Sequence, residues 1–206
     1  MILENNKEFN NIIKFFGKYY GVDVSGVEII YKDMDNEVGH YNVFTFNKIF
    51  ISNKVKGRGV AEEVVIVHEI NHLLQHENNI GLTLNKDIIY KEFNNVVYDT
   101  LDVTDIDTLY YNRDIKAVKL IDDIYEMNDY IASNYWAKHI EIDSRLAEGL
   151  YLYEEFGISG IDILIDQIFR CGAIKAIEDR INNLPNDTVK ELLLNKYNEL
   201  NEKLAC

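Results

Sequence analysis

The sequence predicts an α+β fold in which a helix and a small sheet precede a mostly helical remainder. Three observations support this order: apolar residues at helical spacing near the N-terminus, short alternating segments after them, and helical patterns through most of the second half. The 206 residues are 47% hydrophobic, include one proline and contain no Gly/Ser-rich run. We therefore expect a single domain over residues 1–206, with the helix, the sheet and a central helix in about 1–82 and a helical part in about 83–206.

The N-terminal elements follow from hydrophobic spacing. Apolar residues at intervals of three and four predict a helix over 5–20. Residues 26–31 alternate as in a strand, and the segments 41–46 and 49–51 flank the short turn 47–48. The sequence thus predicts a β-hairpin in a small antiparallel or mixed sheet.

An apolar helix follows the predicted sheet. The Gly-Arg-Gly segment 57–59 breaks the strand pattern and opens a helix to about His76, before the Asn- and Gly-containing segment 78–81 ends it. Later helical patterns cover about 84–99, 114–130, 131–156, 160–182 and 187–204.

Charge and composition exclude several classes of partner. The formal net charge of −14 argues against nucleic acid, because phosphate binding depends on clustered Lys and Arg. The N-terminus lacks the features of a secretory signal, and no window approaches eighteen apolar residues, so we expect a cytoplasmic protein with no membrane contact. Two cysteines are too few for a disulfide framework. The oligomeric state stays open.

Residues 68–72 read His-Glu-Ile-Asn-His and carry the clearest chemistry. On a helix His68 and His72 lie about 40° apart, with Glu69 about 100° from His68, so all three side chains can reach one small volume. Two imidazoles at this spacing can bind one Zn²⁺, and the carboxylate beside them can take a proton from water. The apolar flanks indicate a buried helix, and the alternative is that both histidines are simply hydrogen-bonded in the core.

A catalytic zinc site normally needs a third protein ligand. His76 stands eight residues after His68, roughly 12 Å along the helix axis, which is too far for one ion. The metzincin arrangement, a Gly followed by a third His, is absent, because Gln75 and Asn78 occupy those positions. The third ligand must therefore come from elsewhere in the chain.

The predicted helix 131–156 offers two candidates. On a helical wheel His139 and Asp143 fall within an apolar stripe, whereas Glu141, Arg145 and Glu148 share a charged face. The wheel alone favours His139 as ligand with Asp143 as its carboxylate partner. It assigns Glu141 to an ordinary i,i+4 pair with Arg145.

The segment Glu141-Ile142-Asp143-Ser144-Arg145, together with the motif at 68–72, resembles the small gluzincin-type metallopeptidases of bacteria and phages, of which the ImmA/IrrE-like proteins are one branch. The resemblance implies a zincin-like fold, with Glu141 as third zinc ligand, Ser144 as a small residue that allows close helix approach and Arg145 as a polar group behind the ligands. We favour Glu141 and keep His139, with Asp143 behind it, as the alternative.

These observations together predict a zinc metallopeptidase that cleaves a protein or peptide substrate. His68, His72 and Glu141 would hold Zn²⁺, and Glu69 would accept the proton of water. The strand at 49–52 would line the cleft and pair with an extended substrate. The resemblance suggests a bacterial or phage regulator as substrate. The alternative is a catalytically silent zincin-like protein that binds a partner through its helical half.

Overall fold

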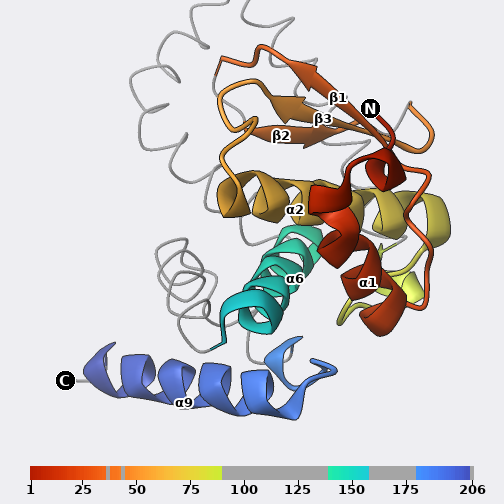
Figure 1. Ribbon diagram of the computed structural model, residues 1–206. Coiled ribbons are helices and arrows are strands. Elements are labelled where there is room, and N and C mark those ends of the chain that lie inside the picture. Colours follow the sequence, from red (N-terminus) through yellow and green to blue (C-terminus); the bar gives the residue numbers. More distant parts are fainter. Residues whose placement is uncertain (36–37, 43–44, 90–138, 158–179, 205–206) are drawn as a thin grey trace, which may run out of the picture.

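The computed structural model describes residues 1–35, 38–42, 45–89, 139–157 and 180–204, and it has a mixed α+β architecture (Figure 1). Two short 3-10 helices, Leu3–Asn5 and Lys7–Phe9, lead into the first α-helix. The principal elements are α1 (Asn10–Tyr19), β1 (Glu28–Lys32), β2 (Gly39–Tyr41), β3 (Lys48–Ser52), α2 (Val60–Asn78), α6 (His139–Phe156) and α9 (Asp187–Leu204).

The three strands form one mixed sheet in the order β1-β3-β2. Central strand β3 pairs in parallel with β1 and antiparallel with β2. The predicted antiparallel pairing is therefore present, but the predicted bounds of the hairpin are wrong, because β2 ends at Tyr41. The carbonyl of Asn42 accepts hydrogen bonds from the backbone N–H and the hydroxyl of Thr45, at 2.9 and 2.8 Å.

Helix α1 is shorter than the predicted helix over 5–20, because its first residues form the 3-10 turns instead. The side chain of Asn6 accepts a hydrogen bond from the backbone of Glu8 and caps the second of these turns. Phe15 and Phe16 are buried on one face of α1, and the ring of Phe15 lies edge-on to Tyr151 of α6, with 5.5 Å between centroids.

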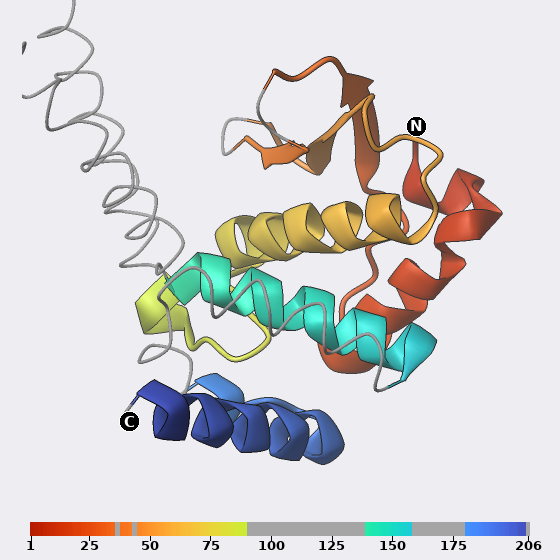
Figure 2. The same ribbon diagram turned by 90° about the vertical axis from the view of Figure 1, so that its left-hand side faces the viewer.

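Helix α2 forms the middle layer of the molecule. Figures 1 and 2 show the sheet on one side of it and α6 on the other, with α9 beyond α6. Gly59, with φ of 57°, precedes the helix, and Asn79 ends it in the left-handed conformation with φ of 53°. The predicted end near His76 is thus correct to within two residues.

The later predictions fall partly outside the described residues. Helix α9 matches the prediction for 187–204, and α6 matches the described part of 131–156. Residues 86–89 and 180–181 are helical, as predicted, while 90–138 and 158–179 lie outside the described residues. None of the helices in the described ranges is both long and apolar enough to cross a membrane.

Candidate metal centre

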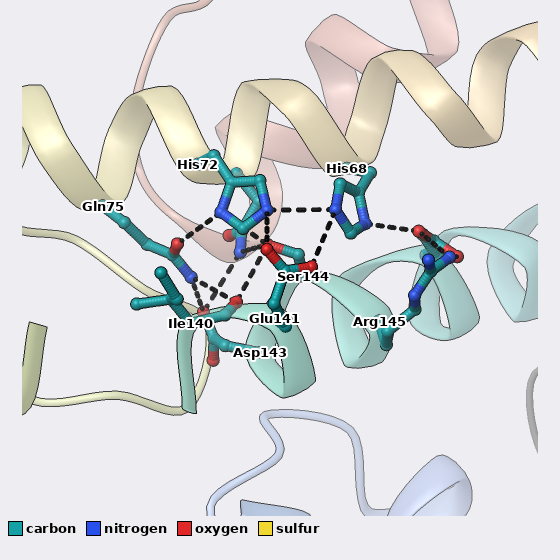
Figure 3. A network of polar contacts seen from close by, with 10 residues as sticks. His68, His72, Gln75, Ile140, Glu141, Asp143, Ser144 and Arg145 are labelled. Carbon is teal, nitrogen blue, oxygen red and sulfur yellow. Dashed lines mark hydrogen bonds and ion pairs between the residues drawn. The ribbon is translucent and has the colours of Figure 1, made fainter. Parts of the chain in front are cut away.

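Helices α2 and α6 bring three potential metal ligands together (Figure 3). His68 and His72 extend from α2 so that their Nε2 atoms lie 3.0 Å apart. Glu141 reaches them from the first turn of α6, with its two carboxylate oxygens 3.4 Å from His68 Nε2 and 3.2 Å from His72 Nε2. All three residues are buried, and this group could hold a metal ion.

The charges of the group are strongly coupled. Burial lowers the pKa of His68, but the carboxylates of Glu148 and Glu141 outweigh this effect and raise it from 6.5 to about 10. Burial raises the pKa of Glu141, but His72 and His68 outweigh this effect and hold that pKa well below its usual value. The site therefore favours a positive charge between the histidines and Glu141.

Glu148 is the partner of His68 on the side away from Glu141. Its Oε1 lies 2.5 Å from His68 Nδ1, and both of its oxygens accept hydrogen bonds from Arg145 Nη1, at 2.9 and 3.0 Å. The helical wheel alone would pair Arg145 with Glu141, but Arg145 forms an ion pair with Glu148. Arg145 is thus linked to His68 through Glu148.

Gln75 is the principal partner of His72. Its Oε1 lies 3.0 Å from His72 Nδ1, while its Nε2 donates to the Ile140 carbonyl at 3.2 Å and to Asp143 at 2.9 Å. The Ser144 hydroxyl lies 3.3 Å from the same His72 nitrogen. Asp143, predicted behind the ligands, is therefore linked to His72 through Gln75.

Asp143 also fastens α6 to the segment that follows α2. It accepts hydrogen bonds from the backbone N–H groups of Leu82 and Thr83, and from the Thr83 hydroxyl, at 2.7–2.9 Å. A Cβ atom at Gly81 would lie 2.7 Å from the Asp143 carboxylate, so the chain can approach this closely only with glycine there. Donors of the protein thus satisfy both oxygens of the Asp143 carboxylate.

Asn71, the fourth residue of the motif, connects three helices. Its Oδ1 accepts a hydrogen bond from Tyr20 at 2.7 Å, and its Nδ2 donates to Ser144 at 2.8 Å and to Asp143 at 3.2 Å. The contacts of Asn71, like those of Glu148 and Gln75, were not predicted from the sequence. One feature of the sequence pointed to these contacts: Asn71 places an amide within an apolar helix, and a buried amide needs hydrogen-bond partners.

Glu69 lies on the side of α2 that faces the sheet. It is 6% exposed, and burial raises its pKa although His68 and His72 oppose the shift. The edge strand β2 lies directly against it: a Cβ atom at Gly39 would be 2.6 Å from Glu69 Oε1. The carboxylate is thus confined between α2 and the backbone of β2.

The remaining candidate residues lie elsewhere or are not described. His76 is placed outside the ligand group, with its Nδ1 2.9 Å from the Tyr41 hydroxyl. His139 is the first residue of α6, and its side chain lies outside the described part of the chain. The predicted placement of strand 49–52 along an open edge is wrong, because β3 is the central strand and is paired on both sides.

Comparison with models of protein families, with curated proteins and with solved structures found no match to this chain.

Proposed function

We propose that this protein is a zinc-dependent metallopeptidase in which His68, His72 and Glu141 hold the zinc ion. The observation that carries the proposal is the convergence of these three ligand atoms, with the buried Glu69 next to His68 in the same turn of α2. Two histidines and one carboxylate are a known donor set for catalytic zinc, which leaves one position open for water or substrate.

The spacing of the donors supports this choice of metal. Ligand atoms bound to one tetrahedral ion at about 2.0–2.1 Å lie roughly 3.3–3.4 Å from one another. The three separations among His68 Nε2, His72 Nε2 and the Glu141 oxygens are 3.0, 3.2 and 3.4 Å. A small tetrahedral cation therefore fits with little movement of the side chains.

Charge balance also supports a divalent ion. Glu69, Glu141 and Glu148 place three buried carboxylates around the histidines, and Arg145 is the cation paired with one of them. With both imidazole rings neutral, as zinc binding requires, two negative charges remain, which a dication would neutralise. Asp143 needs no such partner, because backbone and side-chain donors already surround it.

Bound zinc would supply a Lewis acid that lowers the pKa of water and polarises the scissile carbonyl. Glu69 acts as general base: it accepts the proton of the attacking water and passes it to the leaving amine. Its burial, which raises its pKa, makes the carboxylate a stronger proton acceptor than an exposed one.

The edge strand β2, rather than β3, is the surface on which an extended substrate would pair. Ser52 N–H donates to the Val38 carbonyl at 2.9 Å, and Gly39 stands opposite Ile51. Because hydrogen-bonded pairs alternate along an antiparallel ladder, the backbone groups of Gly39 and Tyr41 point away from β3. A peptide added at this edge would run past Glu69.

The decisive experiment is Glu69→Gln, assayed on a library of peptides with the zinc-loaded protein. We expect turnover to be abolished and zinc to stay bound, because the amide keeps its shape but cannot accept the proton. Glu155→Gln on the exposed end of α6 is the matched control and should keep activity. Full activity of Glu69→Gln would overturn the mechanism.

The wild-type protein must also cleave peptides in this assay and lose activity with a chelator. If the zinc-loaded wild type cleaves none, the rival function as a silent zincin-like binding protein is favoured. The Glu69→Gln variant, which should bind substrate without cleaving it, provides a trap for the natural substrate. We expect a protein regulator of bacterial or phage origin.

A further inference from the structure

The hydrogen bonds behind the metal centre determine which nitrogen of each histidine carries its proton. A neutral imidazole has one donor and one acceptor nitrogen, and the group that faces Nδ1 decides which is which. At His68 this group is the carboxylate of Glu148, whose two oxygens both accept from Arg145 Nη1. A carboxylate paired with a guanidinium is an acceptor, so His68 Nδ1 is the donor.

The groups around His72 lead to the same conclusion by a different chain of contacts. Gln75 Nε2 donates both to the Ile140 carbonyl and to Asp143, so the amide can only turn its oxygen toward His72. The Ser144 hydroxyl donates to the Ile140 carbonyl at 3.1 Å, which leaves an oxygen lone pair facing His72. Every partner of His72 Nδ1 among the described residues is thus an acceptor.

We infer that Glu148 and Gln75 are positioning residues that hold His68 and His72 in the Nδ1–H form, so that both Nε2 lone pairs face Glu141. The inference rests on the metal site of the proposed function. It adds an asymmetry to that site, because a carboxylate orients His68 and a neutral amide orients His72. A carboxylate partner makes the imidazole a stronger electron donor, so His68 is the stronger ligand of the pair.

The test uses the full-length protein with ¹⁵N-labelled histidine and compares Glu148→Gln and Gln75→Met with the wild type. Zinc affinity is measured by competition with a chelator, and NMR of the imidazole nitrogens reports which one carries the proton. In the zinc-loaded wild type we expect protonated Nδ1 atoms and metal-bound Nε2 atoms on both rings.

Each variant should change the signal of one ring. Glu148→Gln keeps an acceptor oxygen for His68 but removes the charge, so the His68 Nδ1 proton signal should move upfield while that of His72 stays. Gln75→Met removes the acceptor and should move the His72 signal alone. We expect zinc affinity to fall about 10–100-fold in Gln75→Met and less in Glu148→Gln. Glu155→Gln is the control and should change neither measurement.

The outcomes separate this inference from the proposed function. In the zinc-loaded protein, a protonated Nε2 on either histidine would overturn the positioning roles even if peptides are cleaved. Unchanged affinity and unchanged signals in both variants would overturn them too. Zinc binding with the expected proton positions but without cleavage would overturn only the peptidase function. A wild-type protein that binds no zinc would overturn both.

Discussion

Glu141 is the residue whose removal should weaken metal binding most. It is 2% exposed, and its two oxygens face the Nε2 atoms of both histidines. We predict that Glu141→Ala lowers zinc affinity by more than about 100-fold, because loss of a partner behind a ligand already costs 10–100-fold. Zinc content after dialysis and chelator competition measure the effect.

The matched substitution is His139→Ala, two residues earlier on the same helix. Since Glu141 completes the group of three ligand atoms, we expect His139→Ala to keep bound zinc. The opposite pattern, zinc lost in His139→Ala and kept in Glu141→Ala, would assign the third ligand to His139.

The relative positions of site residues could be predicted from the sequence where the residues share one helix. His68, Glu69 and His72 lie within five positions of one helix, so their spacing determines their relative placement. Glu148 stands 80 positions from His68, and no local pattern connects the two. Gln75 lies one turn from His72, and that i,i+3 spacing was the only local sign that it could orient the ring.

At the scale of elements, the helical wheel failed for α6. A wheel identifies the buried face only when the opposite face meets solvent. Within residues 140–152 all but Arg145 are buried, so the face predicted as charged and exposed is the one that meets α2. Glu141 and Glu148 project from that face toward the histidines. Long-range packing, which the sequence pattern does not contain, buries this face.

The close approach of β2 to α2 leads to a second prediction. A Cβ atom at Gly39 would lie 2.6 Å from Glu69 Oε1 and 2.8 Å from its Cγ, so Gly39→Ala must displace the strand or the carboxylate. We expect peptide cleavage to fall roughly 100-fold, as for a misplacement of about 1 Å at a reacting group. Zinc affinity should stay unchanged, because the atoms nearest to that Cβ belong to Glu69 and Val65 and not to the three ligands.

Gly17→Ala provides the control for Gly39→Ala. Its added Cβ would meet nothing within 4 Å, so the variant should keep its activity. Its stability should be equal or slightly higher, because alanine favours a helix over glycine. Thermal unfolding of both variants separates a local effect on Glu69 from loss of the fold. Full activity in Gly39→Ala would show that contact with β2 does not determine the position of Glu69.

At the scale of the molecule, the candidate metal centre joins two parts of the chain that are distant in sequence. Buried side chains of α1, the sheet, α2, α6 and α9 form one hydrophobic cluster, and the ligand group lies where α2 meets α6. The sequence predicted the α+β order and the bounds of α2 and α9 because these depend on local patterns. It could not place α6 against α2, since that contact spans about seventy residues.

Because zinc would cross-link α2 and α6, its removal should destabilise the whole fold. Free zinc at 100 times its Kd stabilises the native state by about 2.7 kcal/mol if the unfolded chain does not bind it. For a chain of this size that corresponds to a Tm increase of roughly 5–11 °C. Calorimetry with and without a chelator measures this difference in Tm. The Glu141→Ala variant should show no such difference.

The stabilisation by zinc should also grow with pH. In the metal-free protein burial lowers the pKa of His68, but Glu148 and Glu141 outweigh this effect and raise the pKa from 6.5 to about 10. Charged His68 therefore stabilises the fold fully below pH 6.5. This contribution is lost as the pH rises through 10. Zinc requires the neutral ring and must displace that proton. Its affinity should therefore rise about tenfold per pH unit over this window, or about 1.4 kcal/mol.

Titrations in buffers of different ionisation enthalpy should show release of about one proton. A stabilisation independent of pH would contradict a ligand role for His68.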